Sequence, residues 1–232
     1  MRFGPLAVAL SLAAATPALA QTVPEQPAQA PAQAPSEAPS QDPAQRFQAY
    51  VTSDGYKAMI AQLAVMGDTI SAPDCKEHKP QERASLTVYG PPHFENGVHP
   101  VTGLWVDRIK MNRCGASTFQ NILIQANKDG QPPRAALMMP GSSMANPPLQ
   151  NLVMKDILDA LAKKKCTDQS QIIPVDTKYE KESKPLKLND KGMIIEGAWK
   201  ETWTLKACGK PTSISVEINS DGKGGLVHKI KL

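Results

Sequence analysis

Two segments of the chain, beginning at Gly103 and at Gly197, carry the same residue types at the same spacing. Each begins with Gly-x-Trp, has an acidic residue two positions after the tryptophan, and has a Cys-Gly pair nine positions after it. An apolar stretch and an Asp-Gly turn signal follow in both. We interpret this agreement as an internal duplication. The matching pairs are Trp105 and Trp199, Asp107 and Glu201, Cys114 and Cys208, and Asp129 and Asp221.

The correspondence continues upstream, where each segment has a second cysteine that follows a helical pattern of apolar residues. The cysteines are Cys75 and Cys166. Apolar residues recur at helical spacing at Tyr56, Ile60 and Leu63, and at Leu149, Val153, Ile157 and Leu161, with Asn146 as a predicted cap. Strand candidates at 84–89 and 172–179 precede the tryptophans. We predict an α+β fold of two tandem repeats, each a helix followed by about four antiparallel strands.

The sequence divides into four parts. Residues 1–20 combine Arg2, a short apolar run and a final Ala-Leu-Ala, which predicts a signal peptide cleaved after Ala20. Residues 21–45 are rich in Pro, Ala and Gln and are predicted to be a disordered spacer. The first repeat is expected at 46–145 and the second at 146–232. Because a single repeat is long enough for only a small core, we expect the two repeats to pack as one body.

The same features predict the compartment. No later apolar stretch approaches the roughly 20 residues of a membrane-spanning helix, so we expect no membrane span after signal cleavage. The protein is therefore predicted to be periplasmic or secreted. Its formal charge of +4 is not concentrated in a basic stripe, which argues against nucleic-acid binding.

Four cysteines in an exported chain predict two disulfides. The duplication favours Cys75 with Cys114 and Cys166 with Cys208, because each repeat would then contain the same local bridge. Spacing alone leaves open the alternative in which Cys75 pairs with Cys166 and Cys114 with Cys208.

The repeated acids, Asp107 and Glu201, are weak candidates for catalysis. Alternate residues of a strand share a face, so each acid is expected beside its tryptophan on an otherwise apolar face. A carboxyl group buried there would need a partner, and a raised pKa would suit acid–base chemistry or binding of a basic ligand. The simpler interpretation is structural: a carboxylate at the wet end of a strand, or one paired with Lys or Arg. We expect Trp105 and Trp199 to anchor the core.

A metal site is a second weak hypothesis. His93, Glu95 and His99 lie in a Gly- and Pro-rich loop, and these residue types bind borderline metals. The loop has no counterpart in the second repeat, which argues against it. Met138 and Met139 are expected in a strand and Met144 in a surface turn, as filler instead of soft-metal ligands. Residues 222–225 are predicted to form a hairpin turn, and we find no cofactor-binding motif.

The pattern from Trp105 to Cys114-Gly115, repeated from Trp199 to Cys208-Gly209, resembles that of an uncharacterised family of exported proteobacterial proteins. The resemblance implies compartment and architecture, and no catalytic residue. The duplication, the export signal and the absence of a catalytic motif lead us to expect a non-catalytic binding or scaffold module of the cell envelope, with no cofactor, whose partner is another envelope protein, a glycan or a small ligand. The alternative is a hydrolase or lyase that uses Asp107 and Glu201 as an acid–base pair.

Overall fold

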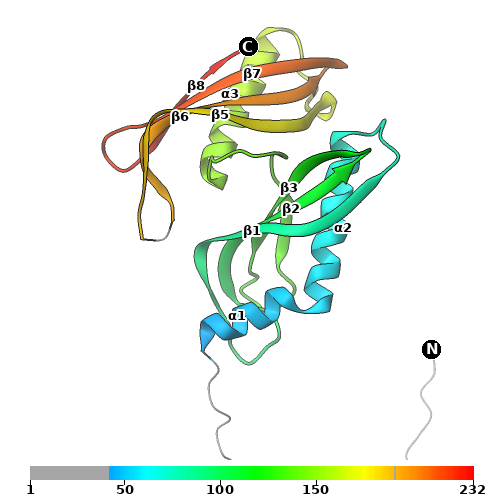
Figure 1. Ribbon diagram of the computed structural model, residues 1–232, viewed down its shortest axis with the longest axis vertical. Coiled ribbons are helices and arrows are strands. Elements are labelled where there is room, and N and C mark those ends of the chain that lie inside the picture. Colours follow the sequence, from blue (N-terminus) through cyan, green and yellow to red (C-terminus); the bar gives the residue numbers. More distant parts are fainter. Residues whose placement is uncertain (1–41, 191) are drawn as a thin grey trace, which may run out of the picture. The chain divides into compact units, whose positions relative to one another are not determined.

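The computed structural model describes residues 42–190 and 192–232 (Figure 1). The predicted signal peptide and residues 21–41 of the predicted spacer lie outside the described residues. Residues 43–45 of that spacer, predicted to be disordered, belong instead to helix α1, which spans Pro43–Thr52. Asp42 caps this helix by accepting a hydrogen bond from the Ala44 amide at 3.1 Å, and proline is well suited to the first helical position.

The first sheet follows a second helix. Its strands are all antiparallel and lie in the order β1-β2-β3-β4. The elements are α2 (Asp54–Ser71), β1 (His78–His93), β2 (Thr102–Arg113), β3 (Ala116–Gln125) and β4 (Arg134–Leu137). Strand β1 is longer than residues 84–89, and Met138 and Met139 lie beyond β4, contrary to the expectation that they form part of a strand.

The second sheet follows a third helix and has the order β5-β6-β7-β8, again antiparallel. The elements are α3 (Pro147–Lys163), a 3₁₀ turn (Gln169–Gln171), β5 (Ile172–Leu188), β6 (Ile194–Ala207), β7 (Lys210–Ser220) and β8 (Leu226–Lys231). Residues 222–225 connect β7 to β8, as expected for a hairpin turn. The predicted α+β class is thus confirmed, with two four-stranded antiparallel sheets and three α-helices among the described residues.

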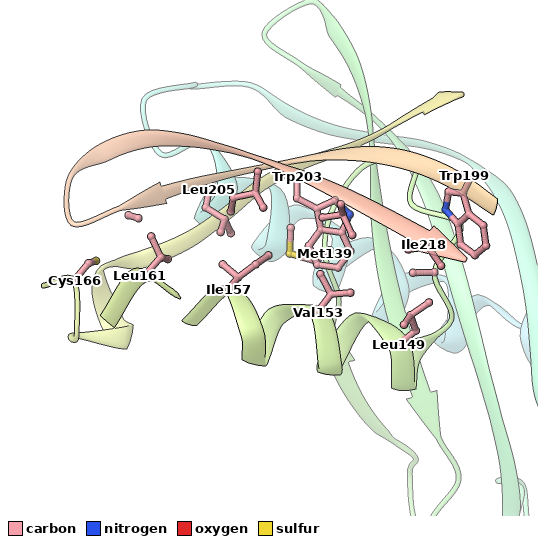
Figure 2. Close-up of a cluster of buried hydrophobic side chains, with 14 residues drawn as sticks. Met139, Leu149, Val153, Ile157, Leu161, Cys166, Trp199, Trp203, Leu205 and Ile218 are labelled. Carbon is pink, nitrogen blue, oxygen red and sulfur yellow. The ribbon is translucent and has the colours of Figure 1, made fainter. Parts of the chain in front are cut away.

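Each sheet buries one face against helices. In the first core, Tyr56, Ile60 and Ala64 of α2 meet Trp105 and Ile109 of β2, with Phe47 and Val51 contributed by α1. In the second core, Val153, Ile157 and Leu161 of α3 point toward Trp203 and Leu205 of β6, and Leu149 points toward Ile218 of β7 (Figure 2). Trp105 and Trp199 are 0% and 1% exposed, which confirms that they are core anchors. Both sheets belong to one compact unit.

Each sheet is joined by one disulfide to the end of the long helix that precedes it. The two disulfides join Cys75 to Cys114 and Cys166 to Cys208, so the pairing is the local one. Cys75 follows α2 and Cys114 follows β2, and the second pair holds the corresponding places after α3 and β6. No described helix has both the length and the apolar character needed to cross a membrane.

Candidate functional site

Asp107 lies inside the first core with no exposed surface. The Tyr56 hydroxyl donates to Asp107 Oδ2, and Arg83 Nε forms an ion pair with Oδ1. Trp105 Nε1 in turn donates to the Tyr56 oxygen at 2.7 Å. Burial raises the pKa of Asp107, and the interactions with Tyr56 and Arg83 only partly oppose this. Arg83 is therefore the basic partner that the sequence predicted for this carboxylate. The contacts of Asp107 are all made within the core, as a structural role requires.

Glu201 lies inside the second core and is equally buried. Its carboxylate accepts hydrogen bonds from Trp199 Nε1 at 2.7 Å, Trp203 Nε1 at 2.7 Å and the Met144 amide at 2.8 Å. All three donors are neutral. The extra methylene of glutamate lets it reach both indoles directly, whereas Asp107 contacts Trp105 only through the Tyr56 hydroxyl.

The structure does not bring the two repeated acids together. Asp107 contacts Tyr56 and Arg83, Glu201 contacts a separate set of donors, and each is enclosed in a different apolar cluster. An acid–base pair must reach the reacting atoms of a substrate, and neither carboxylate has any surface open to one.

The predicted metal ligands also remain separate. His99 Nδ1 lies 3.2 Å from the Tyr50 hydroxyl, and its ring packs edge-on against the Tyr50 ring. Within residues 42–190 and 192–232, no group of three or more His, Cys, Asp or Glu side chains could hold a metal ion. His93, Glu95 and His99 therefore do not form a metal site in the described structure.

A third buried carboxylate, Asp68 of α2, was not anticipated from the sequence. It accepts hydrogen bonds from Arg113 at 2.6 and 2.9 Å and from Gln120 at 3.1 Å, and His78 Nδ1 lies 2.6 Å away. His78 Nε2 lies 3.1 Å from the Cys75 carbonyl oxygen, so both ring nitrogens face oxygen atoms. Burial acts to raise the pKa of Asp68, but these hydrogen bonds outweigh it and the pKa is lowered.

The segment that connects β4 to α3, residues 138–146, is bonded to both sheets. Asn121 Nδ2 of β3 donates to the Met139 and Gly141 carbonyl oxygens, at 2.8 and 3.1 Å. On the other side, the Ser142 amide donates to the Thr177 carbonyl of β5 at 2.7 Å. Gly141 has a φ of 91°, and a Cβ there would overlap the Thr177 backbone, so the close approach requires glycine.

Arg108 lies beside this segment, on the face of β2 opposite Asp107. Its Nε donates to Asn121 Oδ1 at 2.8 Å and its Nη2 donates to the Ser143 carbonyl at 2.8 Å. Burial lowers the pKa of Arg108, while Tyr89 and Glu201 oppose that shift; an arginine nevertheless keeps its charge. None of the described carboxylates lies within ion-pair distance of the guanidinium.

A cavity of about 250 Å³ opens next to Arg108, between β1 and β2 of the first sheet and the elements around the second. Its polar lining includes Ser85, Thr87, Tyr89, Asn121 and Asn146. Its apolar lining includes Val106, Met144, Leu188, Ile194 and Leu226. Because residues far apart in the sequence meet here, the cavity is the candidate functional site of this protein.

Two polar groups at this cavity are free to bind a ligand. Arg108 Nη1 and the Tyr89 hydroxyl make no hydrogen bond to any residue in the described part of the chain. Tyr89 and Arg108 line the same cavity. Burial raises the pKa of Tyr89, and the charge of Arg108 opposes that change. Sequence reasoning missed both residues. Strand alternation places the side chains of Arg108 and Asp107 on opposite faces of the sheet. Only the folded chain shows that the face of Arg108 is also covered.

A second cavity, of about 390 Å³, is mainly apolar and lies between α2, β4 and α3. It is lined in part by Ile70, Leu137, Met138, Met139 and Met154. None of its described lining residues is charged. Comparisons of the chain with models of protein families, with characterised proteins and with solved structures found no match.

Proposed function

We propose that this chain is an exported, non-catalytic binding protein of the cell envelope, built from two copies of one α+β unit, which holds a small ligand in the cavity beside Arg108. The observation that carries the proposal is the convergence of unpartnered polar groups, Arg108 Nη1 and the Tyr89 hydroxyl, on a partly apolar cavity. Binding sites for small molecules commonly have this composition.

Matching backbone features support the duplication. Trp105 is opposite Ile124 in the β2–β3 pair, and Trp199 is opposite Ile218 in the β6–β7 pair. The helix caps Ser53 and Asn146 each accept a hydrogen bond from the amide three residues later. Cys114 and Cys208 both have a φ of 47°. A duplication of one segment within this chain would explain why a cysteine with positive φ follows both tryptophan-bearing strands.

Two disulfides support the proposed periplasmic or secreted location, because disulfides persist in oxidising compartments. The resemblance to exported proteobacterial proteins agrees with this location. The alternative function, a hydrolase or lyase based on Asp107 and Glu201, gains no support from the site geometry, since both carboxylates are enclosed by their own hydrogen-bond donors.

The proposal is tested by native mass spectrometry of the protein purified from its own envelope without denaturation. Ser85 and Ser213 are both exposed strand serines, but only Ser85 lines the cavity. We expect a small molecule to co-purify with the wild type and with Ser213→Trp, and to be absent from Ser85→Trp. Wild-type protein that carries no small molecule, or Ser85→Trp that retains it, would contradict the proposed function.

A further inference from the structure

The cavity beside Arg108 has an unbalanced charge. Among its described lining residues, Arg108 is the only group charged at neutral pH, and no aspartate or glutamate lines it. The charge of Glu201 acts to raise the pKa of Arg108, but the Glu201 carboxylate already accepts three hydrogen bonds in the second core. The positive charge therefore faces the cavity without a direct counter-ion.

The guanidinium is also held in a fixed orientation. Asn121 and the Ser143 carbonyl bind two of its nitrogens, and its centre lies 6.0 Å from the centroid of the Phe119 ring. A planar guanidinium whose orientation is fixed in advance loses little entropy when it binds a planar anion. Nη1 and the hydroxyl of Tyr89, which line the same cavity, are both hydrogen-bond donors that suit one anionic group.

The remaining wall is apolar and the space is small. Val106, Leu188, Ile194 and Leu226 come from both sheets and contribute hydrocarbon surface. A cavity of about 250 Å³ lies below the roughly 300–1,000 Å³ typical of sites for drug-sized ligands. A free inorganic anion would leave the apolar wall unused, and a pure hydrocarbon would leave Arg108 unpaired. A small amphipathic anion satisfies both parts of the lining.

The number of cations selects the class of anion. A phosphate monoester carries about −1.5 to −2 charges at pH 7, whereas a carboxylate carries one. Arg108, the one cation among the described lining residues, balances one negative charge, and a second negative charge in a half-buried site would be costly. Resting on the proposed binding function, we infer that the natural ligand is a small monocarboxylate with an apolar body, whose carboxylate binds Arg108 and Tyr89.

The test is isothermal titration calorimetry with four probes of equal chain length: octanoate, octanol, octylamine and octyl phosphate. Wild-type protein is expected to bind octanoate at least 10-fold more tightly than the other three. Arg108→Gln should lower octanoate affinity at least 10-fold and remove the preference over octanol. Because Arg108 also holds the connecting segment, Tyr89→Phe provides a second variant that breaks no hydrogen bond within the described residues. It should weaken octanoate several-fold, and Ser213→Trp should bind like the wild type.

Several results would overturn the inference. Equal binding of octanoate and octanol, or tighter binding of octyl phosphate, excludes a carboxylate specificity, and so does octanoate affinity that survives Arg108→Gln and Tyr89→Phe. Octanoate binding that is unaffected by Ser85→Trp would place the probe elsewhere, such as the methionine-lined second cavity. In each case a co-purifying small molecule that is lost in Ser85→Trp would leave the proposed function standing.

Discussion

Arg108 and Glu201, which belong to different sheets, are joined through a single peptide group. The Ser143 carbonyl accepts a hydrogen bond from Arg108 Nη2 at 2.8 Å, and the Met144 amide of the same peptide donates to Glu201 Oε1 at 2.8 Å. The carbonyl faces the cation and the amide faces the anion, so both hydrogen bonds are charge-assisted. The connecting segment is thereby anchored to both sheets at one point.

Replacing Glu201 with glutamine is expected to destabilise the fold by about 2 kcal/mol. One amide oxygen can still accept from Trp199 and Met144, but the amide nitrogen faces Trp203 Nε1, and two donors then oppose each other. Denaturant unfolding measures the loss. Glu217 is an exposed glutamate on the neighbouring strand β7, so Glu217→Gln should change stability by less than about 0.5 kcal/mol. Equal stability of the two variants would contradict the role assigned to Glu201.

Gly141→Ala is expected to loosen the connecting segment. The new methyl group would overlap the Thr177 backbone, in addition to the cost of a left-handed conformation. Gly224 is the matched control, since its φ of 86° is similar and an added Cβ would meet nothing within 4 Å. We expect Gly141→Ala to lower the unfolding midpoint clearly more than Gly224→Ala. Similar midpoints would show that the close approach of residues 141 and 177 is not required.

The stability contributed by Asp68 should depend on pH. Its pKa in the folded protein is lowered below the ordinary aspartate value of 3.8, so its contribution is fully present above that pH and is lost as pH falls through the folded pKa. Asp68→Asn should therefore cost about 3 kcal/mol at pH 7, and the difference from wild type should shrink in acid. The exposed Asp74 gives the control, Asp74→Asn, which should match wild type throughout. A difference that is constant from pH 7 to pH 2 would refute the ionic role.

Asp107 should show the opposite dependence. Its pKa in the folded protein is raised above 3.8, so the folded state binds the proton more tightly and stability falls as pH rises through that range. Relative to wild type, Asp107→Asn is expected to gain stability between the unfolded pKa and the raised folded pKa. Urea unfolding at a series of pH values compares the two variants directly. Parallel profiles for Asp68→Asn and Asp107→Asn would contradict the contrast drawn between their environments.

Removing the second disulfide with Cys166→Ser and Cys208→Ser together should cost about 4 kcal/mol, because the bridge closes a loop of roughly 40 residues in the unfolded chain. The first disulfide closes a loop of similar length and should contribute a similar amount. Labelling with a thiol reagent tests the pairing. Native protein should expose no free thiol, and the double serine variant should retain the Cys75–Cys114 bridge. Four reactive thiols in native protein would rule out both bridges.

Local sequence patterns were enough to predict most elements of this fold. The apolar spacing from Leu149 to Leu161 predicted helix α3. The predicted cap, Asn146, is the residue that caps this helix in the structure. Helix α1 was missed because its segment continues a proline- and alanine-rich stretch, and its stability depends on burying Phe47 and Val51 in a core that includes Trp105. The additional length of β1 and β5 was missed for a related reason, since their outer ends are exposed and charged and lack an apolar alternation.

The sequence by itself determined the class of fold, the two tryptophan anchors and the cysteine positions that the disulfides use, because these depend on spacing along the chain. Only the tertiary structure decided that both repeated acids are enclosed and that the candidate site lies beside Arg108. Tyr89, Arg108, Ser143 and Leu226 meet because the connecting segment hydrogen-bonds to both sheets. Such a meeting depends on long-range packing, which no local pattern of residues encodes.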